Sequence, residues 1–238
     1  MKNAIVTGGT KGIGLSIAKM LLKENYFVYI TYATDVDAAQ QAELELCKIN
    51  SAFCIKRVNQ LYAEQIHFFT KELENQSIDC IVCNAGSTIR KATPDITDNE
   101  WNDIMQINVH SHFFLIRNLW KQVQFDARII FIGSMMAIHP HATSLPYGVT
   151  KAALHALAKN LVKDFDGTQV TVNTVAPGFV ETDWQKNKPQ GIKDNINKKT
   201  ALHRFADSDE IASAVRFLLR SSFINGSVIE VSGGYNYR

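Results

Sequence analysis

The sequence lacks a strong charge bias, and it lacks any long apolar run. Its 238 residues contain 25 lysines and arginines against 23 aspartates and glutamates, a formal net charge of +2. A charge this close to zero disfavours binding to nucleic acid or to an anionic membrane surface. The first apolar segment, Ala4–Thr7, is too short for a signal-peptide core, and no later run approaches the roughly 18 residues of a membrane-spanning helix. We therefore expect no nucleic-acid partner and no membrane partner.

Cysteine is scarce, and its four copies form no recognisable site. Cys80 and Cys83 make a C-x-x-C pair, but the pair lies inside an apolar run, whereas redox pairs usually open a helix that lowers the thiol pKa. A zinc site needs a second pair of Cys or His residues at matched spacing, and the sequence has none. We predict buried structural thiols, no metal site and a cytoplasmic location.

Short apolar runs alternate with segments of helical period. Seven runs have the length of β-strands: Ala4–Thr7, Phe27–Tyr32, Ala52–Val58, Ile78–Cys83, Arg128–Gly133, Gln169–Val175 and Ser227–Val231. Strands that alternate with helices predict βαβ units and a parallel sheet, and continuous apolar strands predict helices on both faces. The expected fold is α/β: a single doubly wound Rossmann-type domain over residues 1–238, with a seven-stranded parallel sheet.

One segment, residues 185–200, interrupts this pattern because it is polar and rich in Lys and Asn. A solvated surface segment is one interpretation. The other is a mobile substrate lid, since long loops in compact domains often have a function. The sequence leaves both open.

A glycine-rich turn follows the first expected strand. Residues 7–14 read Thr-Gly-Gly-Thr-Lys-Gly-Ile-Gly and open an expected helix. Glycines allow a tight turn and close backbone approach, so the pyrophosphate of a dinucleotide can bind at the helix N-terminus. The turn alone is a weak signal, but Ile13 after Gly12 excludes the Gly-Lys-Ser/Thr of a nucleoside-triphosphate P-loop.

Three side chains further along the chain suit acid–base chemistry. Tyr147 and Lys151 are four residues apart, so they share one face of a helix expected to begin near Leu145. An ammonium group beside a phenol stabilises the phenolate, so we expect the pKa of Tyr147 to fall below its usual value of about 10. Ser134 ends an expected strand, where its hydroxyl can donate to a substrate carbonyl.

Several motifs together resemble those of the short-chain dehydrogenase/reductase family, over essentially the whole chain. They are T-G-x-x-x-G-x-G in the glycine turn, Asn84-Ala85-Gly86, Asn108 in the expected helical run Asn99–Trp120, Ser134, Tyr147-x-x-x-Lys151, and Pro177-Gly178 followed by Val180-Glu181-Thr182. The resemblance implies a catalytic set of Asn108, Ser134, Tyr147 and Lys151, in which the asparagine holds a proton-relay water. It also implies that a dinucleotide contacts Gly8, Thr10, Lys11, Gly12, Ile13, Gly14, Thr34, Asn59, Gln60, Asn84, Ala85, Gly86, Tyr147, Lys151, Pro177, Gly178, Val180 and Thr182.

The end of the second expected strand bears on the choice of cofactor. NAD-binding proteins tend to place an acid there, on the ribose 2′-hydroxyl, but the first acid here is Asp35, beyond the strand. Lys11 lies where NADP-using relatives tend to carry a base, and it can pair with a 2′-phosphate that Thr34 also hydrogen-bonds. We therefore predict a preference for NADP(H) over NAD(H). The resemblance places Asn59 and Gln60 where relatives often carry an aspartate and an apolar residue, so the adenine contact stays open.

Within this family, residues 101–104, 176–183 and 231–235 are most similar to the 3-oxoacyl-[acyl-carrier-protein] reductases. The resemblance implies a homotetramer in fatty acid biosynthesis that reduces a 3-oxoacyl thioester, carried on acyl carrier protein or CoA, with NADPH. Phe125 and Thr168 stand where that group carries carrier-docking arginines. The alternatives are an oxidoreductase for another small alcohol or ketone, such as a sugar, a steroid or a secondary metabolite, and a nucleotide-binding regulatory protein without turnover. The regulatory protein is disfavoured, because nucleotide binding alone does not require Ser134, Tyr147 and Lys151 together.

Overall fold

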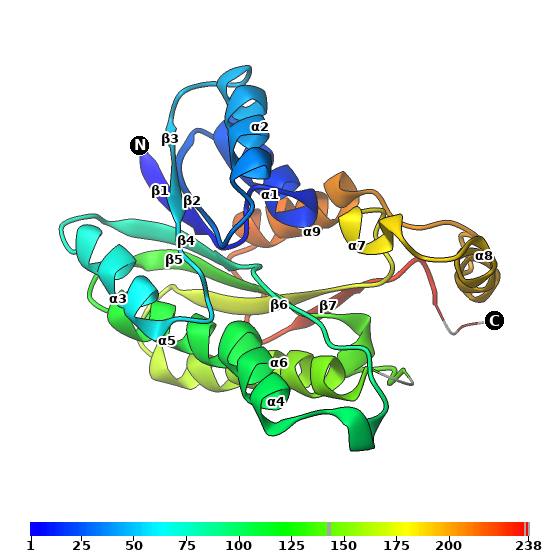
Figure 1. The fold of residues 1–238 in the computed structure, drawn as a ribbon. Coiled ribbons are helices and arrows are strands. Elements are labelled where there is room, and N and C mark those ends of the chain that lie inside the picture. Colours follow the sequence, from blue (N-terminus) through cyan, green and yellow to red (C-terminus); the bar gives the residue numbers. More distant parts are fainter. Residues whose placement is uncertain (142–143, 236, 238) are drawn as a thin grey trace.

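Seven strands form one parallel sheet in the computed structural model, which describes residues 1–141, 144–235 and 237. The strands lie in the order β3-β2-β1-β4-β5-β6-β7, so the chain begins in the middle of the sheet and winds outward in both directions (Figure 1). Their bounds are β1 Lys2–Val6, β2 Tyr26–Tyr32, β3 Phe53–Arg57, β4 Ile78–Cys83, β5 Val123–Ile132, β6 Thr171–Pro177 and β7 Val228–Val231. This topology confirms the predicted doubly wound, Rossmann-type α/β fold.

Helices cover both faces of the sheet (Figure 1). One face carries α1 (Gly12–Lys23), α2 (Val36–Cys47) and α9 (Ser208–Arg220), and the other carries α3 (Ala63–Glu72), α4 (Asp98–Met105), α5 (Ser111–Asn118) and α6 (Leu145–Asp164). Each layer encloses an apolar core, with Ile17 and Val215 fully buried on the first side and Phe131 and Leu154 on the second. Two covered faces explain why the strands read as continuous apolar runs. In the described part of the chain, none of the helices has the length and apolarity needed to cross a membrane.

Cys80 and Cys83 lie fully buried in β4, and neither forms a disulfide. Burial raises the pKa of both thiols, that of Cys80 to about 12. Thiols that stay protonated at neutral pH are poor nucleophiles, which confirms the prediction of buried structural thiols for this pair. Cys47 is exposed and Cys54 is partly exposed, so the prediction does not hold for them.

The helical run predicted over Asn99–Trp120 is not one continuous helix. A π-helical turn, Gln106–His110, separates α4 from α5. Such a turn inserts an extra residue into the helical repeat and is often found at functional sites. Here it contains Asn108, whose side chain is fully buried.

Residues 185–200 are mostly helical, so the loop expected there is wrong in its secondary structure. The segment includes the last two residues of α7 (Asp183–Lys186) and all of α8 (Gln190–Lys199), which follow β6. One apolar residue of α8, Ile196, is buried against Met135, which follows β5. This anchor explains how a polar segment packs on the domain without an apolar stripe of its own.

Candidate active site

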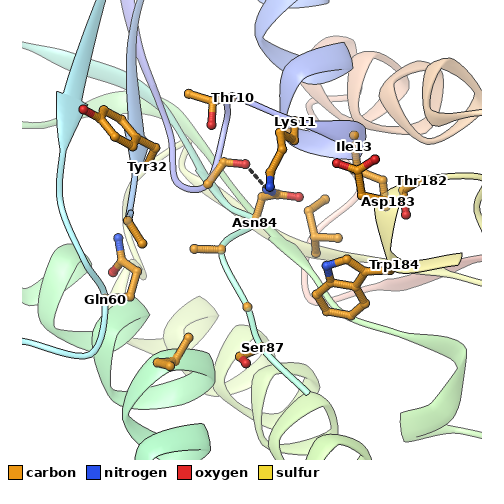
Figure 2. A pocket seen from close by; sticks show the side chains of 18 of the residues that line it. Thr10, Lys11, Ile13, Tyr32, Gln60, Asn84, Ser87, Thr182, Asp183 and Trp184 are labelled. Atoms are coloured by element: carbon orange, nitrogen blue, oxygen red, sulfur yellow. Dashed lines mark hydrogen bonds between the residues drawn. The ribbon is translucent and has the colours of Figure 1, made fainter. Parts of the chain in front are cut away.

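A cavity of about 560 Å³ opens at the carboxyl ends of the parallel strands. In Figure 2, Tyr32 and Gln60 lie on one side of it and Thr182, Asp183 and Trp184 on the other, with Thr10, Lys11 and Asn84 between them. Its lining includes every residue for which the sequence predicts a dinucleotide contact, and also Ser134. Sequence reasoning missed the further lining residues Tyr32, Ala33, Asp35, Val58, Leu61, Ser87, Ile107, Ile132, Gly133, Asp183, Trp184 and Gln185.

The glycine turn leaves room for a ligand against the backbone. Gly8 and Gly12 have φ values of 61° and 49°, a region that side-chain-bearing residues rarely adopt. A Cβ atom on Gly14 would lie 2.3 Å from the Gly8 carbonyl oxygen and 2.5 Å from Nδ2 of Asn84. Among the described residues, no side chain caps the N-terminus of α1, so its first N–H groups remain available to an anion. This cradle fits the pyrophosphate of a dinucleotide.

Thr7 and Asn84 hold the turn in place across two strands. The Thr7 hydroxyl oxygen accepts hydrogen bonds from the backbone N–H groups of Asn84 and Ala85, both at 3.0 Å. Nδ2 of Asn84 donates to the carbonyl oxygens of Thr7 and Gly8, both at 2.9 Å. The Asn84 side chain therefore stabilises the cradle, and Thr7, which sequence reasoning gave no role, is its partner.

Ser134, Tyr147 and Lys151 converge on the cavity from two elements. Ser134 follows β5, and its hydroxyl hydrogen-bonds the side chain of Tyr147 on α6. Lys151, one helical turn further, is buried and donates from Nζ to the carbonyl oxygen of Ile132 at 2.7 Å. Its Nζ lies 5.6 Å from the centroid of the Tyr147 ring. The spacing of Tyr147 and Lys151 thus places both on one helix face, as predicted.

The electrostatics of this group differ from the sequence expectation. Burial raises the pKa of Tyr147 to about 12, although the hydrogen bond from Ser134 and the charge of Arg90 act in the opposite direction. Burial also lowers the pKa of Lys151 to about 8. The fall in the Tyr147 pKa expected from a neighbouring ammonium is therefore not found, because desolvation has the largest effect on that pKa and the Lys151 ammonium donates to the Ile132 carbonyl oxygen.

Asn108 lies beneath the cavity rather than in its wall. Its Oδ1 accepts a hydrogen bond from the Ser87 backbone N–H at 2.7 Å, and its Nδ2 donates to the Ser87 carbonyl at 2.9 Å and to Oγ1 of Thr150 at 2.9 Å. The side chain joins the segment after β4 to helix α6, which carries Tyr147 and Lys151. These hydrogen bonds hold the two segments in a fixed relative position.

At the far end of the cavity, Lys11 already has a protein partner. Its Nζ lies 2.7 Å from Oδ2 of Asp35. The hydrogen bond from Lys11, followed by one from the Ala38 backbone N–H, holds the pKa of Asp35 below its usual range. The sequence shows that Asp35 is the first acid after β2, but it does not show that Asp35 pairs with Lys11.

Trp184 of α7 lies beside the predicted catalytic tyrosine. Its ring is 6.0 Å from that of Tyr147, edge to face. Together with Arg90 and Ser87 it also lines a shallow pocket of about 420 Å³ that adjoins the main cavity. Helix α7 therefore forms one wall of the space in front of Tyr147.

Comparisons with known proteins agree with this geometry. A family model described as enoyl-(acyl carrier protein) reductase matches residues 8–236. The 3-oxoacyl-[acyl-carrier-protein] reductase FabG of Staphylococcus epidermidis is 32% identical over 240 residues, which cover 98% of this chain and 98% of that protein. A short-chain dehydrogenase/reductase from Serratia marcescens has a similar structure, with a TM-score of 0.93 and 27% identity over 99% of this chain and 98% of the other. A short chain dehydrogenase from Burkholderia cenocepacia, solved in complex with NADP, gives a TM-score of 0.92 and 25% identity over 98% and 97% of the two chains.

The fold, the cradle and these matches define an NAD(P)-dependent oxidoreductase that acts on CH–OH and C=O groups. The chain belongs to the short-chain dehydrogenase/reductase family, which confirms the resemblance that its motifs indicate.

Proposed function

We propose that this protein reduces 3-oxoacyl thioesters to 3-hydroxyacyl thioesters with NADPH. The observation that carries the proposal is the convergence of Ser134, Tyr147 and Lys151 beside a cradle that fits a dinucleotide. The names of two relatives support it, since the proteins from Staphylococcus epidermidis and Aquifex aeolicus, which match over 98% and 96% of their own length, are 3-oxoacyl-[acyl-carrier-protein] reductases. The complex of a similar structure with NADP supports the choice of cofactor.

The cofactor would lie along the cavity, in contact with the glycine turn, the segment Asn84–Gly86 and residues 177–182. When bound, it supplies a hydride to the carbonyl carbon. The Ser134 hydroxyl would donate a hydrogen bond to the carbonyl oxygen and stabilise its growing negative charge. Tyr147 would then donate its phenolic proton to that oxygen, and Lys151 would hold the nicotinamide ribose.

The pKa of Tyr147 bears on proton transfer in this proposal. With a pKa of about 12, the phenol is protonated at neutral pH and is ready to act as an acid. The positive charge of an oxidised nicotinamide would lower the pKa again after hydride transfer.

A second candidate is an oxidoreductase for another small alcohol or ketone. The observation that favours it lies at the positions expected to dock a carrier protein. Phe125 is exposed, and the Thr168 hydroxyl donates to the Phe165 carbonyl oxygen at 2.6 Å, so neither offers a positive charge. An acidic carrier protein would have to dock through other residues.

A substrate panel separates the two candidates. Acyl carrier protein thioesters, CoA thioesters and simple ketones are compared by kcat/KM, each with NADPH and with NADH. The proposal predicts the highest kcat/KM for a 3-oxoacyl thioester with NADPH. A simple ketone or sugar reduced at least as well as every thioester would favour the second candidate.

We further propose a lid, a homotetramer and a cytoplasmic location. Helices α7 and α8 would close over the substrate, since Trp184 already faces Tyr147. Large apolar side chains on α5, just after it and on α9 are exposed in the single chain, among them Phe113, Trp120 and Phe217, which suits burial between subunits. The cysteines are unpaired, which suits a reducing compartment.

A further inference from the structure

The ion pair between Lys11 and Asp35 lies where the ribose 2′ position of a dinucleotide is expected. Both residues line the cavity beside Tyr32, Ala33 and Thr34, at the end of β2. The ammonium and carboxylate groups are 2.7 Å apart, and each side chain is 47% exposed. The positive charge of Lys11, which the sequence predicts to pair with a 2′-phosphate, is therefore partly neutralised by Asp35.

Asp35 is held by both of its oxygens. Oδ2 bonds Lys11, and Oδ1 accepts a hydrogen bond of 3.0 Å from the Ala38 backbone N–H, which caps the N-terminus of α2. To turn away from Lys11, the carboxylate would have to give up this cap. Its lowered pKa keeps it ionised at neutral pH, so a negative charge stays fixed at this end of the cavity.

One further cation, on the neighbouring strand, does not line the cavity but bonds a residue that does. Nε of Arg57, the last residue of β3, donates to the Ala33 carbonyl oxygen at 3.1 Å. Among the residues that the structure describes, Arg57 has no acidic partner within ion-pair distance. A 2′-phosphate can thus gain from Arg57, but beside Lys11 it also meets the Asp35 carboxylate.

We propose that Asp35 is a specificity-determining residue that opposes Lys11 and restrains the preference of this enzyme for the 2′-phosphorylated cofactor. A 2′-phosphate carries nearly two negative charges at neutral pH, so it competes with the carboxylate for Lys11 and is repelled by it. An uncharged 2′-hydroxyl meets no such repulsion. The inference rests on the dinucleotide site of the proposed function, and it concerns the cofactor rather than the carbonyl substrate.

The test is the variant Asp35→Asn, with cofactor affinity measured in the absence of substrate. Asparagine keeps an oxygen for the Ala38 N–H and caps helices as well as aspartate does, so the fold and α2 are retained. The Kd of NADPH and of NADH is obtained from the change in nicotinamide fluorescence. The NADPH/NADH affinity ratio is expected to rise roughly tenfold, because a full like charge is removed and Lys11 is released.

A matched control separates this effect from a change in net charge. Asp37 lies in the first turn of the same helix, is exposed and forms no ion pair with Lys11. Asp37→Asn alters the helix and the net charge in the same way and is expected to leave the affinity ratio within about twofold of the wild type. An equal rise in both variants would overturn the assignment to Asp35.

The role of the ion pair is tested in a Lys11→Met background. There, Asp35→Asn should raise the NADPH/NADH ratio by a clearly smaller factor, since no ammonium remains to be released. A rise of the same size with and without Lys11 would overturn the ion pair as the cause. An unchanged ratio after Asp35→Asn alone would overturn the inference but leave the proposed reductase intact. Failure of the wild type to bind either dinucleotide would contradict the proposed function as well.

Discussion

Replacement of Tyr147 by phenylalanine removes one hydroxyl group from the cavity and keeps the ring. The ring contact with Trp184 at 6.0 Å and the Lys151 ammonium 5.6 Å from the ring centroid are both retained. What disappears is the proton donor and its hydrogen bond with Ser134. Loss of a general acid typically reduces the rate by about 10²–10⁴-fold, which corresponds to roughly 3–5 kcal/mol in the barrier.

The assay follows the loss of NADPH absorbance with a 3-oxoacyl-CoA, and the Kd of NADPH is measured separately. We expect kcat to fall by at least about 100-fold and the Kd of NADPH to stay within a few-fold. Tyr29→Phe is the matched control, because Tyr29 is a partly buried tyrosine of β2 that does not line the cavity. A Tyr147→Phe enzyme that kept more than about a tenth of the wild-type rate would refute the role given to this phenol.

Three further changes follow from the same geometry. Lys151→Met should lower both kcat and NADPH affinity. It should nevertheless raise the free energy of unfolding at pH 7 by about 3 kcal/mol, since the pKa of the buried Lys151 is about 8 against 10.5 when exposed. This gain should shrink as the pH rises from 8 to 10.5, where the wild-type lysine loses its proton, and denaturant titrations that show no gain at pH 7 would contradict the burial argument. Lys11→Met should raise the KM for NADPH more than the KM for NADH, and equal effects on both would show that Lys11 does not act on the 2′-phosphate. Gly14→Ala should abolish tight NADPH binding and lower the melting temperature, because its Cβ would lie 2.3 Å from a backbone oxygen; binding at wild-type affinity would argue against the cradle.

Features encoded by local pattern could be predicted from the sequence. The apolar runs marked all seven strands, because a parallel strand covered on both faces needs apolar residues throughout. The four-residue spacing of Tyr147 and Lys151 was sufficient to place both on one face of α6. The start of β5 at Val123 instead of Arg128 was missed, because apolar and polar residues alternate at its start and do not form a continuous apolar run.

Features that depend on contacts between distant residues could not be predicted. The π-helical turn contains Asn108. Its side chain bonds Ser87 and Thr150, which lie 21 and 42 residues away in the sequence. The pairing of Lys11 with Asp35 joins the turn after β1 to the start of α2. The pKa of Tyr147 depends on the desolvation of the whole pocket, which sequence spacing does not report.

The most direct test of the central claim follows one hydrogen atom. The wild-type enzyme is incubated with a 3-oxoacyl thioester and with NADPH that carries deuterium at the transferable position of the nicotinamide ring, and the product is analysed by mass spectrometry. The account predicts one deuterium on C3 of a 3-hydroxyacyl thioester for each NADPH consumed, and no label with Tyr147→Phe on the same time scale. Unchanged 3-oxoacyl thioester, in a sample whose enzyme binds NADPH and reduces a simple ketone, would contradict it.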